Sequence, residues 1–228
     1  MDAKAILENL LATGKQYAAQ GKNLAEEKLN IPQEGPEREA MVSGMGKGAL
    51  AAGALALLFG TGAGRRLTGS ALKVGSLAAI GGLAYKTYQN WQNQQQTPKN
   101  PGTPVNELSG AAAEDRSIGL IKAMIAAAKA DGHIDDQERA RINEQMQKMQ
   151  LDAGTLAFLK AEVDKPLDVT DVARHADSPE SAAEIYLASV MVIDIDQPAE
   201  REYLSVLAKE LDLDAALAMD LERQVKTL

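Results

Sequence analysis

Two short acidic turns contain the residues whose spacing suggests binding chemistry. The second turn repeats the first at an offset of 62 residues, from Glu138-Arg139 to Glu200-Arg201. Hard cations such as Ca²⁺ are bound by roughly six to eight oxygen ligands, which two such turns could supply together. We therefore expect a divalent-cation site where the turns converge. Its candidate ligands are the carboxylates of Asp131, Asp135, Glu138, Asp194, Asp196 and Glu200.

The same carboxylates have a second explanation as helix caps. Asp135 and Glu138 have capping-box spacing, and both are favoured at a helix N-terminus. The second turn can flank the helix that follows it in the same way. The spacing is not that of an EF-hand, because Asp131 is followed by Gly-His-Ile rather than by acceptors at alternate positions. Capping, cation binding and docking of a protein partner all stay open, and Asp131 and Asp194 are the carboxylates least easily explained as caps.

No catalytic motif accompanies the acidic turns. The chain has no cysteine, which excludes thiolate zinc sites, iron–sulfur clusters and cysteine nucleophiles. A serine-nucleophile motif, a phosphate-binding P-loop and HExxH are also absent from the sequence. We therefore expect a protein that is not an enzyme, and no small-molecule substrate or organic cofactor can be identified.

The elements that position the turns are expected to be helices. Aromatic residues make up only 4% of the chain, so the core must consist mainly of small and aliphatic side chains, which suit closely packed helices. Apolar stripes and capping signals predict an all-α domain over residues 108–228. Its seven helices are expected near residues 110–130, 136–150, 153–164, 169–176, 179–192, 199–211 and 215–227. The candidate N-caps are Asp135, Asp152, Asp168, Ser178 and Asp214.

The two acidic turns also indicate an internal repeat. Each is preceded by an apolar helix and followed by an amphipathic one, so the domain contains two helix–turn–helix units of similar sequence. If the units pack face to face, a pseudo-two-fold axis relates them.

Charge divides the chain into two unlike halves. Residues 1–106 contain 11 basic and 7 acidic residues, a net charge of +4, whereas residues 107–228 contain 13 basic and 25 acidic residues, a net charge of −12. No acidic residue lies between Glu39 and Glu107. A basic segment rich in Gly, Ala and Leu suits contact with an anionic membrane. Nucleic acid is not expected as a partner, because the acidic half would repel phosphate.

The N-terminal half is expected to contain four segments. Residues 1–29 form an amphipathic helix, which either lies on a membrane or self-associates, or else docks on the rest of the chain. Residues 30–43 form a polar linker, residues 44–91 a membrane-associated segment, and residues 92–107 a flexible Pro/Gln linker.

Two hydrophobic runs define the membrane-associated segment. Residues 48–64 carry no charge for 17 positions, and residues 74–85 form a shorter apolar run after Arg65-Arg66. A bilayer-spanning helix needs about 20 apolar residues, so the runs predict a helical hairpin in or on the membrane, with a Gly-rich flexible region or a soluble hairpin as the alternative. Gly53 and Gly60 belong to pairs of small residues at the spacing that lets helices approach closely, which also allows homo-oligomers.

The acidic motifs resemble those of a known superfamily. Ala-Asp-Gly-His-Ile-Asp-Asp-Gln-Glu-Arg at residues 130–139, with Ile-Asp-Ile-Asp and Glu-Arg-Glu-Tyr-Leu downstream, resembles the TerB-like superfamily. The hydrophobic segment and linker before such a domain make residues 44–228 similar to the DUF533 family of YebE-like inner-membrane proteins. This resemblance implies a seven-helix TerB-like domain, attachment to the bacterial inner membrane and a cytoplasmic C-terminal domain. It also implies a link to metal or envelope stress and an acidic metal-binding surface, without an established activity.

We therefore expect a membrane-tethered TerB-like sensing or interaction module that contacts lipid and a protein partner and binds a divalent cation. The alternative is a structural scaffold that oligomerises through its small-residue hydrophobic helices and has no ion-dependent role.

Overall fold

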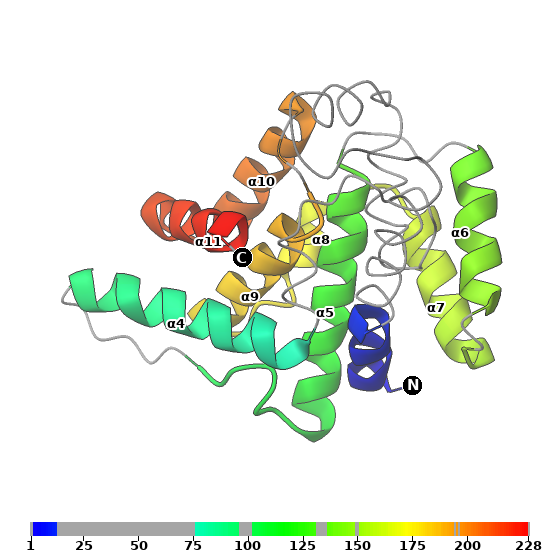
Figure 1. The fold of residues 1–228 in the computed structure, drawn as a ribbon, viewed down its shortest axis with the longest axis horizontal. Coiled ribbons are helices and arrows are strands. Elements are labelled where there is room, and N and C mark those ends of the chain that lie inside the picture. The colour runs from blue at the N-terminus through cyan, green and yellow to red at the C-terminus, as the bar shows by residue number, and fades with distance from the viewer. Residues whose placement is uncertain are drawn as a thin grey trace, which may run out of the picture.

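The chain is all-helical throughout its described residues. The computed structural model describes residues 2–12, 76–95, 102–130, 136–148, 151–193, 195 and 197–227, and every regular element in these ranges is a helix (Figure 1). The first helix covers residues 3–12. The others are α4 (Leu77–Gln95), α5 (Gly110–Ala128), α6 (Asp136–Lys148), α7 (Ala153–Asp164), α8 (Val169–Ala173), α9 (Pro179–Val190), α10 (Pro198–Glu210) and α11 (Ala215–Thr227). The all-α expectation is confirmed for these ranges.

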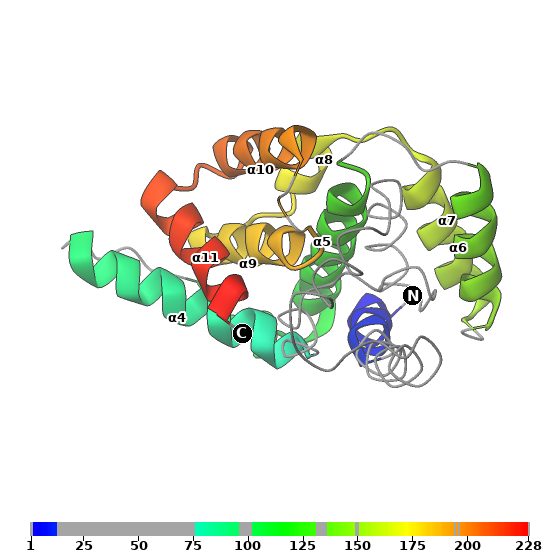
Figure 2. The same cartoon turned by 45° about the horizontal axis from the view of Figure 1, so that its top comes forward.

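Helix α9 is the centre of the structure. Pro179 occupies its first turn, and Ser178 and Ser181 form a reciprocal capping box in which each side chain accepts the other residue's backbone N–H. Every residue from Glu180 to Val190 is buried, because α4, α5, α8, α10 and α11 all pack against this helix (Figures 1 and 2). A helix buried on all sides is normally apolar all round, so its two glutamates are exceptional.

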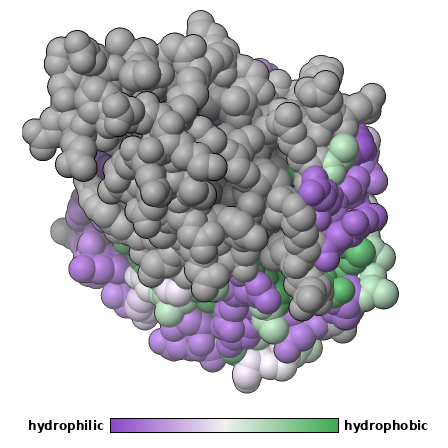
Figure 3. All heavy atoms as spheres, turned by 45° about the vertical axis from the view of Figure 1, so that its right-hand side comes forward, coloured by the Kyte–Doolittle hydropathy of each residue, from purple (hydrophilic) through white to green (hydrophobic). Residues whose placement is uncertain are grey.

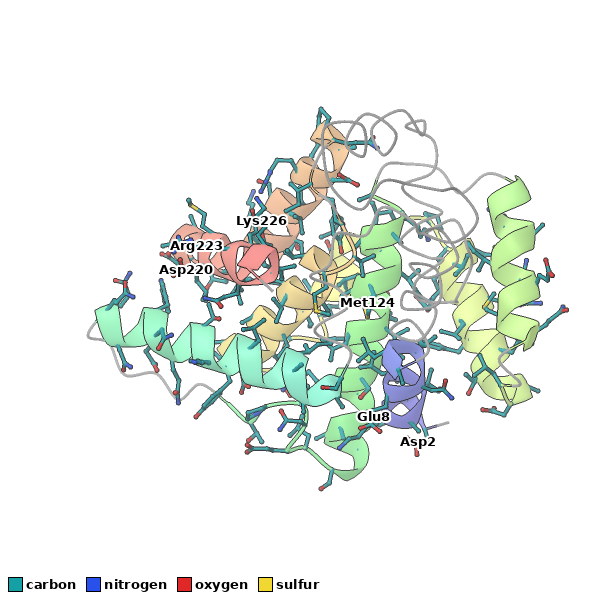
Figure 4. The ribbon with its side chains drawn as sticks, in the orientation of Figure 1. Asp2, Glu8, Met124, Asp220, Arg223 and Lys226 are labelled. Carbon is teal, nitrogen blue, oxygen red and sulfur yellow. The ribbon has the colours of Figure 1, made fainter. Side chains whose placement is uncertain are left out.

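Helix α5 crosses α9 near their C-terminal halves. The Ser189 hydroxyl donates to the Ala123 carbonyl at 3.3 Å, and Tyr203 of α10 lies 3.1 Å from the Ser189 hydroxyl. Met124, labelled in Figure 4, is 5% exposed beside this crossing. The crossing therefore joins three helices through a buried polar contact.

The predicted capping residues occupy their expected places where the structure describes them. Asp152 accepts the backbone N–H groups of Gly154 and Thr155, both at 3.0 Å, and Asp168 accepts that of Asp171 at 2.9 Å. The Asp214 carboxylate accepts the Ala216 N–H, and Ser178 caps α9 as described above. These four predictions are confirmed, whereas the predicted cap Asp135 lies outside the described residues.

The N-terminal helix docks on the start of α5. Its buried apolar residues are Ala3, Ile6, Leu7, Leu10 and Leu11. The Ala3 N–H donates to a Glu114 carboxylate oxygen at 2.7 Å, and the Lys4 ammonium donates to the Leu108 carbonyl at 3.1 Å. Asp2 caps the helix through the Ala5 N–H (Figure 4). Of the two alternatives for this helix, residues 3–12 adopt the docked one, and residues 13–29 lie outside the described ranges.

Helix α4 is an amphipathic helix that packs on the acidic domain. Its buried residues, among them Leu77, Ile80, Ala84 and Tyr88, recur at helical spacing, and α4 contacts α9 and α11. Lys86, Gln89 and Asn90 are exposed, so the apolar residues form a stripe along one side of the helix and do not cover its whole surface. The expected boundary between residues 91 and 92 falls inside this helix.

No helix within the described ranges is both long enough and apolar enough to cross a bilayer. The hydrophobic run at residues 48–64 and its small-residue pairs lie outside those ranges, so the predicted hairpin stays a prediction there. The described atoms on the face drawn in Figure 3 are mainly hydrophilic, with hydrophobic residues in separate small groups.

Candidate functional site

Of the six predicted cation ligands, the structure describes the side chain of Glu200 alone. Glu200 is 7% exposed, and its carboxylate accepts the Gln197 N–H at 3.1 Å in the first turn of α10. Glu200 therefore has the geometry of a helix-capping residue. The backbone of Glu138 belongs to α6, but its side chain is outside the described part of the structure. The other predicted ligands outside it are Asp131, Asp135, Asp194 and Asp196.

The helices that lead into the two acidic turns are well defined. Both turns continue from α5 and α9, which touch at Ala123 and Ser189. The first turn begins eight residues after Ala123 and the second five residues after Ser189. Within the described ranges there is no group of three or more His, Asp or Glu side chains that could hold a metal ion. The six-carboxylate site thus stays a prediction.

Ile195 is the described residue within the second acidic turn. It adopts a φ of 49°, in the left-handed region that a β-branched side chain rarely occupies. Such a conformation costs on the order of 1–3 kcal/mol and persists only where the surroundings enforce it. Ile195 is therefore a position of local backbone strain in the second acidic turn.

Lys129 anchors the end of α5 just before the first turn. Its ammonium donates to the Glu162 carbonyl at 3.2 Å and to the Lys165 carbonyl, both at the C-terminal end of α7. A cation at this position suits the free carbonyls and the negative end of the helix dipole. Burial lowers the pKa of Lys129 below its ordinary value.

A buried ionic centre between α5 and α9 was not foreseen from the sequence. Arg116 is 3% exposed and donates from Nη1 to Glu184 at 2.6 Å and from Nη2 to Asp177 at 2.5 Å. Glu184 is fully buried, and its second carboxylate oxygen accepts the Val105 N–H at 2.7 Å. The pKa of Glu184 is raised, since burial outweighs the backbone hydrogen bond and the Arg116 charge.

Glu180 lies one helical turn before Glu184 and is also fully buried. Within the described structure neither of its carboxylate oxygens has a hydrogen-bond partner. Burial, and then the negative charge of Glu184, raise the pKa of Glu180 to about 8, against the opposing effect of Arg116. A pKa in that range favours the neutral carboxyl form of Glu180 at pH 7, which is unusual for a glutamate.

The segment at residues 102–109 closes over this centre. Gly102 has a φ of 99°, and a Cβ there would lie 2.6 Å from the Ser178 hydroxyl and 3.5 Å from Glu180 Oε2. On α4, a Cβ at Gly81 would collide with the Asn106 side chain and lie 3.2 Å from Glu184 Oε1. Gly102 is thus required by its backbone conformation and close packing, and α4, the 102–109 segment and α9 meet at the buried carboxyl groups.

A sequence signal for this centre does exist. Glu184 follows Glu180 by four positions in a helix whose remaining residues are mainly apolar, and Arg116 lies in an Ala-rich helix. Two acids at that spacing normally mark a solvated helix face. Here the helix face that carries Glu180 and Glu184 has no other polar residue, which indicates that the two glutamates are buried.

The fold and the two acidic features define an all-helical protein with a candidate ion-binding region and a buried carboxyl centre. The chain matches the family described as "Protein of unknown function (DUF533)" over residues 44–225 and belongs to that family. It is also 32% identical over 107 residues to a Yersinia enterocolitica protein described as "Uncharacterized protein in ampR 5′region". The aligned part covers 47% of this chain and 77% of that relative. No solved structure matches the chain.

Proposed function

We propose that this chain is a membrane-tethered, non-enzymatic sensing or interaction module with a TerB-like domain. It binds a divalent cation such as Ca²⁺ through its paired acidic turns and responds to metal or envelope stress at the bacterial inner membrane, with the domain in the cytoplasm. The observation that carries the proposal is the contact of α5 and α9 at Ala123 and Ser189, because both acidic turns continue from these helices.

The helix geometry supports convergence of the turns. With a rise of about 1.5 Å per residue, α5 ends roughly 8 Å and α9 roughly 2 Å beyond the crossing, so both turns start from points close to it. A cation that takes ligands from both turns would hold them together, since neither turn alone provides a complete oxygen shell. The strained backbone at Ile195 supports a functional role for the second turn, because such strain concentrates at functional sites.

The position of α4 supports coupling between a membrane segment and the acidic domain. The charge-free run at residues 48–64 ends 13 residues before α4 begins. Since α4 packs on α9 and α11, a movement of the hydrophobic run would be transmitted to the helix that leads into the second acidic turn. The proposed module therefore connects a lipid-facing region to an ion-binding region through one docked helix.

Calorimetric titration of the full-length chain with Ca²⁺, Mg²⁺ and Zn²⁺ tests the ion site. We expect binding that is lost in an Asp131→Ala/Asp194→Ala variant and retained in an Asp115→Ala/Glu202→Ala control, which removes two exposed carboxylates outside the turns. Absence of binding at millimolar ion, or unchanged binding in the first variant, would overturn the cation proposal.

Membrane fractionation tests the tether separately. We expect the wild-type chain in the membrane fraction and a Leu57→Lys/Leu58→Lys variant in the soluble fraction, because each lysine opposes insertion by about 3 kcal/mol. Leu167→Lys, at a position that is already 40% exposed, is the matched control and should fractionate as wild type. A soluble wild-type chain would contradict the tether.

A further inference from the structure

Glu180 is a buried acid without the partners that would stabilise its charge. It is the second residue of α9, where the positive end of the helix dipole favours an anion. Yet its side chain is 0% exposed, and within the described residues neither carboxylate oxygen accepts a hydrogen bond. An ionised carboxylate in such a place loses its hydration without compensation, whereas a neutral carboxyl loses much less. The geometry therefore favours the protonated form.

The charged groups around Glu180 also favour its protonated form. Glu184 on α9, Glu107 in the 102–109 segment and Asp177 before α9 all disfavour a negative charge, and only Arg116 on α5 favours one. Arg116 is already engaged by two carboxylates, at 2.6 Å to Glu184 and 2.5 Å to Asp177. The Arg116 guanidinium thus forms ion pairs with Glu184 and Asp177, and within the described residues it forms none with Glu180.

The residues packed on this cluster belong to the part of the chain that links α4 to the rest of the domain. Gly102 lies directly against Ser178 and Glu180, and the Val105 N–H donates to Glu184. Val105 is fully buried, and Asn106 contacts Gly81 of α4. Movement of this segment away from α9 would uncover Glu180 on the side of Gly102 and would also remove the contact of Asn106 with Gly81 of α4.

We propose that Glu180 is a proton-controlled latch, whose neutral carboxyl keeps the 102–109 segment and α4 seated on α9 and whose ionisation releases them. The latch binds a proton and does not depend on the cation proposed for the acidic turns. It would make the attachment of α4 to the acidic domain sensitive to alkalinisation of the surrounding solution.

Linkage gives the direction and the range of the pH effect. In the closed state the pKa of Glu180 is about 8, and in an opened, hydrated state it returns towards its ordinary value near 4.5. Between those values the closed state binds the proton and the open state does not, so the ratio of open to closed molecules rises about tenfold per pH unit. The rise stops above pH 8, where Glu180 is ionised in both states.

Amide hydrogen exchange of the full-length chain measures this ratio directly. Under conditions in which the segment closes faster than it exchanges, the protection of the Val105 amide, corrected for intrinsic exchange rates, equals the closed-to-open ratio. In the wild type we expect this protection to fall about 400-fold from pH 5 to pH 8. Glu180→Gln keeps the side-chain shape without the titrating proton, so its Val105 protection should be independent of pH.

Two controls separate the latch from other titrations and from global unfolding. Glu202→Gln removes an exposed carboxylate on α10 and should retain the wild-type pH dependence. The amide of Leu204, in the interior of α10, should keep constant protection. A Leu204 protection that falls in parallel with that of Val105 would mean global unfolding and would refute the latch.

A Val105 protection that does not change with pH in the wild type, or that changes equally in Glu180→Gln, would also overturn the proposal. If Glu180→Gln does not fold, carboxyl-carbon NMR of the wild type decides the matter. A Glu180 resonance that titrates above pH 7 supports the latch, and one that titrates near the ordinary glutamate value refutes it.

Discussion

Replacing Arg116 with methionine would leave Glu184 buried without its cationic partner. The pair is fully desolvated, since the two side chains are 3% and 0% exposed and their atoms lie 2.6 Å apart. Removal of one member of such a pair costs about 3–5 kcal/mol, because the other charge stays buried and uncompensated. The contact with Asp177 adds at most about 1 kcal/mol, since Asp177 is 64% exposed and regains water. We therefore expect Arg116→Met to lose about 3–5 kcal/mol of unfolding free energy.

Urea denaturation followed by far-ultraviolet circular dichroism at pH 7 measures this loss. Against a typical unfolding free energy of about 5–15 kcal/mol, it should shift the midpoint strongly. Adding Glu184→Gln to Arg116→Met removes the orphaned charge and should recover part of the loss. Arg174→Met is the matched control, because Arg174 is 69% exposed and 3.7 Å from Asp171, and it should change stability by less than about 0.5 kcal/mol.

The refuting results for this prediction are specific. A loss below about 1 kcal/mol for Arg116→Met would mean that Glu184 is not charged and buried as described. A double variant no more stable than Arg116→Met would mean that the orphaned Glu184 charge is not the cause of the loss.

Three further variants test local features of the fold by chemical denaturation. Gly102→Ala should destabilise by more than about 1 kcal/mol, because residue 102 has a φ of 99° and a Cβ would lie 2.6 Å from the Ser178 hydroxyl; an unchanged midpoint would contradict this packing. Ser178→Ala removes the α9 cap and should cost about 1 kcal/mol, whereas a stability gain would argue against the capping box. Leu7→Ala should cost about 2–5 kcal/mol if the first helix docks as described, with exposed Glu8→Ala as control; equal midpoints for both would mean that the helix is detached.

Helix positions could be predicted because their signals are local. Pro179 and the serine cap mark the start of α9, and Asp152 and Asp168 mark the starts of α7 and α8 by side-chain contacts within three residues. The expected helix at residues 169–176 was too long, since α8 ends at Ala173. His175 follows in a turn that packs closely on Gly119 of α5, a contact that helix propensity does not reveal.

The partners of α4 could not be predicted from its own residues. Its apolar stripe is compatible with lipid, with another copy or with the rest of the chain, and only the fold shows that α9 and α11 cover it. The buried carboxyl centre was missed for a related reason. Arg116 lies 68 residues before Glu184, and whether Glu180 is buried depends on the 102–109 segment, far away in sequence.

The claim that one cation bridges the two acidic turns has a direct test in a distance measurement. The chain contains no cysteine, so Ala140→Cys on α6 and Glu202→Cys on α10 provide two unique, exposed sites for spin labels just beyond the turns. We expect Ca²⁺ to shorten and narrow the electron–electron distance distribution, and Asp131→Ala/Asp194→Ala to abolish that change. Identical distributions with and without saturating Ca²⁺, or the same change in the alanine background, would contradict the proposed bridge.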